Sequence, residues 1–216
     1  MNKINKDLSK YSYKNIPNIK DKRIIIRSCL NIKNDKNGNF EDLTRFKESL
    51  PLILEMAKSA KSVVILAHLG RPDLFENAGN QLEFSFEKLS HLFADELEKI
   101  NTEIELIKNL ESENIAKIQN QDNNNSESKK IFLVDNIRFF KGEESEDESE
   151  RENFARLLSS LGDVFINDAF ADYRESASTY NLAKFSPSYL GPVFLSEINS
   201  LSKLSEAKKP FVAVLG

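Results

Sequence analysis

RIIIR at residues 23–27 and SVVILA at residues 62–67 are short, uninterrupted runs of apolar, mostly β-branched side chains. Runs of this length and composition are typical of strands that are buried on both faces of a parallel sheet. Three further runs of the same kind follow along the chain, namely EIELI at 103–107, IFLV at 131–134 and VFI at 164–166. The sequence therefore predicts a buried parallel sheet built from these five strands.

Amphipathic stretches with the periodicity of a helix lie between these runs, at residues 44–59, 84–99, 112–119 and 148–161. This alternation predicts an α/β fold, a doubly wound parallel sheet with helices on both faces. The polar, low-complexity segment 120–130 is expected to be a mobile surface loop. The acidic run 143–152 is expected to be the solvated start of the helix that follows it.

The composition excludes several classes of protein. Hydrophobic residues make up 40% of the 216 residues, and no apolar run approaches the roughly 18 residues that a membrane span requires. A net charge of -4 gives no general attraction to nucleic acid. The first twenty residues lack the apolar core of a signal peptide, and the single cysteine, Cys29, permits no internal disulfide. These features favour a cytoplasmic protein with no nucleic-acid or membrane partner.

Polar side chains follow the predicted strands at the edge of the sheet where ligands usually bind. Arginine is informative there because its planar guanidinium can bind a carboxylate or phosphate through two hydrogen bonds. So much positive charge suits a small ligand with two acidic groups, such as a phosphate and a carboxylate. The residues expected at this crevice, which include five of the eight arginines, are Arg27, Cys29, Asn31, Arg45, His68, Gly70, Arg71, Arg138, Asn167, Asp168 and Arg174.

Each of these residues also has a simpler interpretation. Any single arginine could pair with a local carboxylate, and a histidine at the end of a strand, such as His68, is more often a hydrogen-bonding residue than a general base. Cys29 fits a small, half-buried residue, and His91 has no clustered partners that would predict a metal site. The motifs G-x-x-x-x-G-K-S/T and G-x-G-x-x-G do not occur, so no nucleotide site is predicted from motifs.

Four segments, in this order, resemble the phosphoglycerate kinase family: HLGRP at 68–72, VDNIRFFKGEE at 134–144, GDVFINDAFADYRESAST at 162–179 and KKPFVAVLG at 208–216. RIIIRSCLNI precedes them, and the resemblance covers almost the whole chain. It implies a Rossmann-like amino-terminal domain that binds the acid substrate. It also implies the reversible transfer of a phosphoryl group between 1,3-bisphosphoglycerate and ADP in glycolysis.

The resemblance further implies a set of site residues. Arg45 matches the position that stabilises charge on the transferred phosphoryl group, which makes it the catalytic candidate. ATP or ADP with Mg2+ is implied as well, but the residues that hold nucleotide and metal in the family are expected to lie outside this chain. The residues expected to bind 3-phosphoglycerate or 1,3-bisphosphoglycerate are Cys29, Leu30, Asn31, Arg45, His68, Leu69, Gly70, Arg71, Arg138 and Arg174.

Two segments depart from the family pattern. The family has Arg-Val-Asp-Phe-Asn where this chain has RSCLN, so Cys29 replaces the acidic residue that receives the substrate hydroxyl. A thiol is a much weaker acceptor than a carboxylate, and a Cys29→Asp substitution is therefore expected to tighten binding of the acid. The family's Ala-His-Arg-Ala-His segment is DYRES at 172–176, which keeps Arg174 and adds a negative charge at Glu175.

Two regions are expected along the chain. Residues 1–188 form the substrate-binding α/β domain, and residues 189–216 supply a helix between two domains, at 189–205, and the first strand of a nucleotide-binding domain, at 211–215. On this interpretation the chain stops before the nucleotide half and is inactive by itself, and a separate carboxyl-terminal half is a candidate partner. Two alternatives stay open: a non-catalytic module that binds a phosphorylated acid, and an inactive gene relic.

Overall fold

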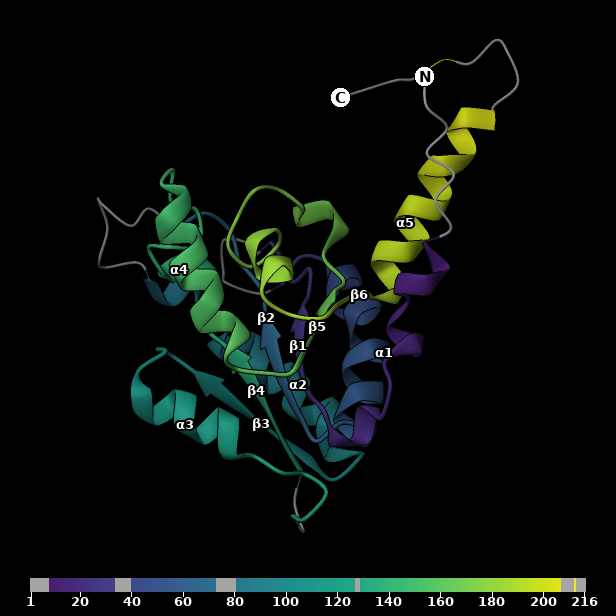
Figure 1. Cartoon of the computed structure of the whole chain (residues 1–216). Coiled ribbons are helices and arrows are strands. Elements are labelled where there is room, and N and C mark those ends of the chain that lie inside the picture. Colours follow the sequence, from purple (N-terminus) through teal and green to yellow (C-terminus); the bar gives the residue numbers. More distant parts are fainter. Residues whose placement is uncertain (1–7, 34–39, 73–80, 127–128, 207–211, 213–216) are drawn as a thin grey trace.

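A sheet of six parallel strands forms the centre of the computed structural model, which describes residues 8–33, 40–72, 81–126, 129–206 and 212 (Figure 1). The spatial order of the strands is β3-β4-β2-β1-β5-β6. The expected strand at 211–215 lies outside the described residues, apart from Val212. The strands are β1 (Arg23–Arg27), β2 (Ser62–Leu66), β3 (Thr102–Ile107), β4 (Lys129–Val134), β5 (Val164–Asn167) and β6 (Ser188–Leu190).

The inner strands owe their burial to the apolar runs in the sequence. Every residue of β2 and β5 is buried, and β1 and β4 are buried along most of their length. The edge strand β3 is different, because Glu103 is exposed and residues 104–106 are only partly covered. Charged side chains on an edge strand discourage pairing with a further strand. The composition of each strand therefore matches its position in the sheet.

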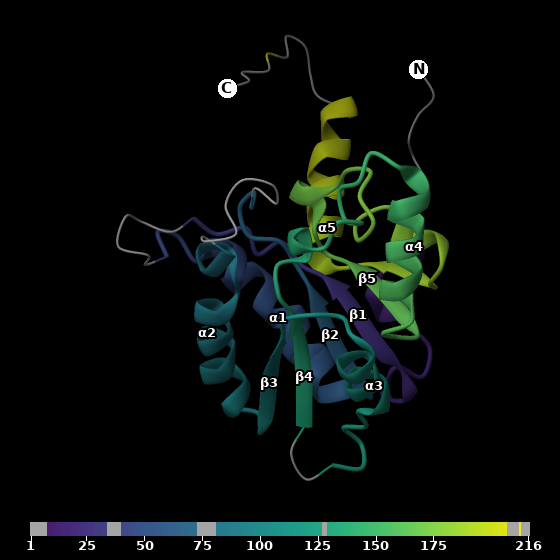
Figure 2. The ribbon, with the colours of Figure 1, turned by 90° about the vertical axis from the view of Figure 1, so that its left-hand side faces the viewer.

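Helices cover both faces of the sheet, and Figure 2 shows α2 and α3 on opposite sides of the strands. Because successive side chains of a strand point to opposite faces, Ile24 and Ile26 pack in one core with α1 and α2, whereas Ile25 packs in the other with α3 and α4. The expected doubly wound α/β fold is confirmed. The helices are α1 (Thr44–Ser59), α2 (Glu87–Glu98), α3 (Ser112–Asn120), α4 (Glu148–Ser159) and α5 (Pro192–Ser202).

The carboxyl-terminal part of the fold differs from the expected helix at 189–205. Residues Ser188–Leu190 form β6, which pairs in parallel with β5, and the helix runs only from Pro192 to Ser202. The sheet therefore extends to Leu190, past the expected domain boundary at residue 188. Three residues between Pro187 and Gly191 are too few to show the alternation that marks a strand.

Two segments that were expected to be solvated each contain a buried polar side chain. Asn123 is 2% exposed, and it receives a hydrogen bond from the Lys130 amide at 2.8 Å and donates to the Lys130 carbonyl at 3.0 Å. The expectation of a mobile loop is therefore wrong at this residue, which is fixed to the start of β4. Glu143 is also 2% exposed, so the acidic run 143–152 is not solvated at its first residue. The helix that the run was expected to start, α4, begins at Glu148.

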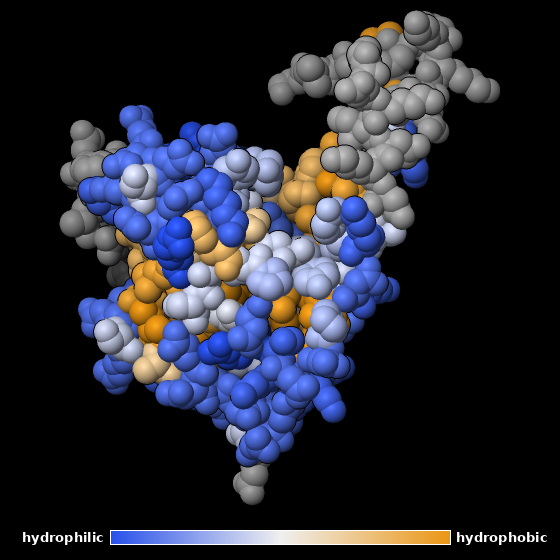
Figure 3. Space-filling view, viewed as in Figure 1, coloured by the Kyte–Doolittle hydropathy of each residue, from blue (hydrophilic) through white to orange (hydrophobic). Residues whose placement is uncertain are grey.

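Apolar side chains are exposed along α5 and near its base, among them Leu201 at 48% and Tyr11 at 45% (Figure 3). An apolar cavity of about 630 Å³ lies where β5, β6 and α5 meet, and aromatic residues such as Phe165 and Phe194 line it. Its lining within the described chain is mostly aromatic or aliphatic and includes Lys184 but no arginine, so this cavity lacks the guanidinium groups expected at the crevice. No helix in the described part of the chain is long and apolar enough to cross a bilayer.

Asp168 holds the amino terminus of α5. Its Oδ1 atom accepts hydrogen bonds from the amides of Val193 at 2.8 Å and Phe194 at 3.2 Å. A Cβ atom added at Gly191 would lie 2.3 Å from the same oxygen, so only glycine allows this close approach. Burial raises the pKa of Asp168 to about 7, although the two amides favour its ionised form. Asp168 therefore serves the fold here, and its carboxyl group titrates near neutral pH.

The raised pKa of Asp168 predicts a specific pH dependence of stability. The folded chain holds a proton on this group between pH 3.8 and about 7, where the unfolded chain has lost it. The stabilising contribution is complete below the unfolded pKa and is lost as pH rises through the folded pKa. We expect the wild type to lose about 1–2 kcal/mol more than Asp168→Asn between pH 5 and pH 8. Urea unfolding of both proteins measures this, and equal losses would contradict it.

Candidate anion-binding site

The carboxyl ends of β1 and β5 form the centre of the site. Along the chain, β1 leads to strands on one side of the sheet and β5 leads to β6 on the other. Such a reversal leaves a crevice beyond the carboxyl ends of the two neighbouring strands, where ligands bind in sheets of this kind. Arg27, the last residue of β1, lies opposite Asn167 in β5. The topology therefore places the crevice next to Arg27.

Arg27 forms the buried base of the crevice and is only 2% exposed. Its Nε atom donates to Ser178 Oγ at 2.9 Å, and Ser178 Oγ donates in turn to Glu143 Oε1 at 2.6 Å. Ser176 Oγ and the Ser178 amide also donate to the Glu143 carboxyl group. Burial raises the pKa of Glu143, while the charge of Arg27 and these hydrogen bonds oppose the rise. A buried guanidinium is stable here because hydroxyl groups link it to a buried carboxyl group.

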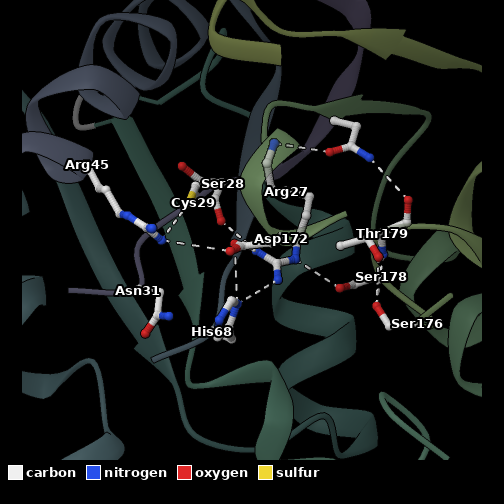
Figure 4. Close-up of polar contacts among 12 residues, drawn as sticks. Arg27, Ser28, Cys29, Asn31, Arg45, His68, Asp172, Ser176, Ser178 and Thr179 are labelled. Carbon is white, nitrogen blue, oxygen red and sulfur yellow. Dashed lines mark hydrogen bonds and ion pairs between the residues drawn. The ribbon is translucent and has the colours of Figure 1, made fainter. Parts of the chain in front are cut away.

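Asp172 lies in the middle of the crevice, at the end of the short 3₁₀ turn Phe170–Asp172 (Figure 4). Its side chain is 5% exposed. Oδ2 lies 3.4 Å from Arg27 Nη1 and 3.3 Å from His68 Nδ1, and Oδ1 lies 3.9 Å from Arg45 Nη1. Three residues that the sequence predicts to face the crevice therefore meet around one carboxylate, which the sequence did not identify as part of the site.

The groups around Asp172 differ in charge. Burial lowers the pKa of His68, and burial together with the nearby carboxylate raises the pKa of Cys29 to about 11, so both are neutral at pH 7. Burial would raise the pKa of Asp172, but hydrogen bonding to His68 and the charge of Arg27 outweigh it and hold that pKa below its usual value. Asp172 is therefore the ionised acid of this cluster.

Arg45 reaches the crevice from the first turn of α1. The Asp42 side chain accepts a hydrogen bond from the Thr44 amide at 2.8 Å and so satisfies the first backbone amide of this helix. The guanidinium of Arg45 is 42% exposed and donates to Cys29 Sγ at 3.1 Å. Figure 4 shows it pointing toward Asp172 across the thiol. Arg45 therefore combines a fixed backbone with a side chain that an incoming ligand can contact.

The loop after β2 is held by side chains from other elements. Gly70 has a φ of 59°, a left-handed conformation that favours glycine, and its amide donates to Asn31 Oδ1 at 2.8 Å. Asn136 Nδ2 donates to the Leu69 carbonyl at 2.6 Å. Arg138 Nη1 donates to the Gly70 carbonyl. These contacts bring the HLGRP loop against the ends of β1 and β4.

Glu144 bridges two of the crevice arginines. Arg138 Nε donates to Glu144 Oε1 at 2.8 Å, and Arg174 Nη2 contacts the same oxygen. Arg138 is 8% exposed, whereas the side chains of Arg174 and Glu144 are 43% and 41% exposed. The guanidinium groups of Arg138 and Arg174 are therefore close enough to contact one oxygen of a carboxylate together.

The structure brings most of the sequence-predicted site residues together, but in different roles. Asn167 donates to the Thr179 carbonyl and, like Asp168, supports the fold. The side chains of Leu30 and Leu69 are buried in the apolar core, so only their backbone groups can reach a ligand. Arg71 is exposed at the rim. Residues grouped at the crevice by contacts are Arg27, Cys29, Asn31, Arg45, His68, Gly70, Arg138 and Arg174.

Sequence reasoning missed three carboxylates, namely those of Asp172, Glu143 and Glu144. All three lie in segments that resemble family motifs, but an acidic residue in a charged segment is usually solvated, so composition gave no reason to place them at the crevice. The altered segment 172–176 was the available signal. The segment carries acidic residues beside Arg174, and such residues are consistent with a contact between a carboxylate and a crevice arginine.

Comparison with known proteins decides the family. The family model for phosphoglycerate kinase matches residues 14–216. The chain belongs to the phosphoglycerate kinase family. The phosphoglycerate kinase of Helicobacter pylori strain J99 is 38% identical over 97% of this chain, and that of Wolinella succinogenes is 36% identical over 92%. The alignments cover 50% and 46% of those two proteins, so the chain spans about half the length of the curated relatives it matches.

Solved structures of the family support the same assignment. The phosphoglycerate kinase of Pyrococcus horikoshii superposes with a TM-score of 0.74 and 26% identity over 92% of this chain and 46% of that one. The phosphoglycerate kinase of Coxiella burnetii superposes with a TM-score of 0.69 and 28% identity over the same shares. The six-stranded domain is therefore a phosphoglycerate kinase fold.

Proposed function

We propose that this chain supplies the half of a phosphoglycerate kinase that binds 3-phosphoglycerate, for reversible phosphoryl transfer between 1,3-bisphosphoglycerate and ADP. One observation carries the proposal. The cationic side chains of Arg27, Arg45, Arg138 and Arg174 gather at the β1–β5 crevice of a domain that belongs to this family. Several guanidinium groups around one crevice suit a ligand with a phosphate at one end and a carboxylate at the other.

The arginines would have separate tasks in such a site. Arg138 and Arg174 already hold the oxygen of Glu144, which an anionic group of the ligand would replace. Arg45, exposed at the amino terminus of α1, would stabilise charge on the transferred phosphoryl group. Arg27 is too deeply buried to bind ligand through its whole guanidinium, and it would keep Asp172 and His68 in place.

The nucleotide and the metal belong to other residues in this proposal. The described residues contain no group of three His, Cys, Asp or Glu side chains that could hold a metal ion. ATP or ADP with Mg2+ would be bound by a carboxyl-terminal half, either in one longer chain or as a separate partner. We further propose a cytoplasmic location. A non-catalytic module that binds a phosphorylated acid remains the alternative, and the thiol at Cys29 is the observation that favours it.

Binding of 3-phosphoglycerate tests the proposal. Arg71→Ala and Arg138→Ala are each expected to weaken binding by about 1.5–3 kcal/mol, the contribution of a charge-assisted hydrogen bond. Titration calorimetry at low salt measures the effect, because screening weakens such contacts at high salt.

Arg156→Ala is the matched control for these two variants. Arg156 lies in α4 and stacks on the ring of Phe185 at 4.0 Å, away from the crevice. Its loss should leave the affinity for 3-phosphoglycerate unchanged. If the wild type binds the acid no better than the Arg71→Ala/Arg138→Ala double variant does, the crevice is not the binding site.

A further inference from the structure

The carboxylate of Asp172 lies among the cationic side chains of the crevice. Asp172 is ionised and its side chain is 5% exposed, and anionic ligands would be repelled by it if electrostatics alone acted. Pairing with Arg27 explains part of its position, and Glu143 is linked to the same guanidinium only through Ser178. The Asp172 carboxylate lowers the positive charge that would attract an anion, unless it accepts a hydrogen bond from the ligand.

The contacts of Asp172 leave capacity for such a hydrogen bond. Charge-assisted hydrogen bonds are about 2.7–2.9 Å long, whereas the nitrogens of Arg27, His68 and Arg45 lie 3.4, 3.3 and 3.9 Å from the Asp172 oxygens. His68 Nδ1 also lies 3.0 Å from Arg27 Nη2, so it can accept from the arginine or donate to the carboxylate but not both. The Cys29 thiol, its remaining polar neighbour, is a weak donor.

One oxygen of Asp172 is better placed for a ligand than the other. Oδ2 faces the buried pair Arg27 and His68, whereas Oδ1 faces Arg45, whose guanidinium is 42% exposed (Figure 4). A ligand held by Arg45 would therefore pass close to Oδ1. A carboxylate accepts only, so the complementary group on an anionic ligand is a hydroxyl.

We propose that Asp172 is the hydroxyl acceptor of this site and makes it selective for phosphorylated hydroxy acids over the corresponding deoxy acids. The carboxylate that the family supplies from the position of Cys29 would come here from the turn after β5. The inference rests on the proposed function, because it names the group that recognises the middle of the same ligand. It assigns to Asp172 a contact with substrate rather than a role in the fold alone.

The test compares two ligands on the wild type. One is 3-phosphoglycerate and the other is 3-phosphonooxypropanoate, which keeps both anionic ends and lacks the hydroxyl. We expect the wild type to bind the hydroxy acid about 10- to 100-fold more tightly. The deoxy acid would leave the Asp172 carboxylate without a hydrogen-bond donor, and this makes its binding free energy less favourable. Calorimetric titrations of the unaltered chain give this ratio, so the test does not depend on a variant that folds.

Variants then assign the selectivity to Asp172. Asp172→Ala should bring the ratio of the two affinities close to one, whereas a purely structural role would weaken both ligands alike. Glu175→Ala, which removes an exposed charge from the segment that follows Asp172, should keep the wild-type ratio. Cys29→Asp in the Asp172→Ala background should restore the ratio, because it returns a carboxylate to the same cluster.

The geometry also changes the expectation for Cys29→Asp alone. A second carboxylate at position 29 would lie beside Asp172, and the two negative charges would repel each other. Cys29→Asp alone is therefore expected to weaken binding of the acid, whereas the sequence predicts tighter binding.

Each outcome separates the two proposals. Equal affinity of the wild type for both ligands would overturn the role of Asp172 and leave the acid-binding function intact. Binding of neither ligand would overturn the proposed function and this inference with it. Loss of the ratio in Glu175→Ala as well would show that general charge, and not Asp172, sets the preference.

Discussion

Glu143→Ala is expected to lower the free energy of unfolding by about 3 kcal/mol or more, because each buried donor left without its acceptor costs about 1–3 kcal/mol. Glu143 is 2% exposed, and three donors converge on it from Ser176 and Ser178. Alanine would leave these donors without their acceptor and would remove the group that orients Ser178 Oγ toward Arg27. Because the segment around Ser176 and Ser178 carries Arg174, the crevice should loosen as well.

Urea unfolding at neutral pH measures the loss. Glu146→Ala is the matched control, since Glu146 lies in the same acidic run but is exposed, and its stability should stay within about 0.5 kcal/mol of the wild type. Glu143→Gln keeps the side-chain volume and an acceptor oxygen, so its loss should be well below that of Glu143→Ala. A Glu143→Ala protein as stable as the Glu146→Ala control would contradict the buried network.

The largest functional effect is expected at Arg45. Phosphoryl transfer depends on positioning and on neutralising charge around acid, nucleotide and metal together, so the 216 residues alone should give no turnover with 3-phosphoglycerate, ATP and Mg2+. Addition of the carboxyl-terminal half of a relative, such as that of Helicobacter pylori, should produce activity. Arg45→Ala should then lower the rate about 10²- to 10³-fold, as expected for the loss of one preorganised donor.

A coupled assay that follows ADP formation measures this rate. Lys47→Ala is the control, because Lys47 is an exposed cation on the same turn of α1 and should leave the rate unchanged. Turnover by the 216 residues alone, well above that of an Arg45→Ala preparation, would defeat the requirement for a second half. No activity on mixing would favour the non-catalytic module.

The elements that the sequence predicts well are those whose signal is local. The helix expected at residues 44–59 has the same ends in the structure, and the inner strands match the apolar runs to within two residues. Helical periodicity and continuous apolar runs are properties of neighbouring residues, so no knowledge of distant contacts is needed. β6 was missed because its three residues, which pair with β5, carry no pattern of their own.

What the sequence by itself determined is the doubly wound sheet and the edge at which arginines follow its strands. Only the tertiary structure decided which carboxylates meet those arginines: Asp172 lies 145 positions from Arg27, and Glu143 lies 35 from Ser178. A charge can be buried only where a partner from elsewhere in the chain compensates for lost hydration, and the chain's path chooses that partner. Composition near Asp172 therefore could not reveal that its carboxylate lies inside the crevice.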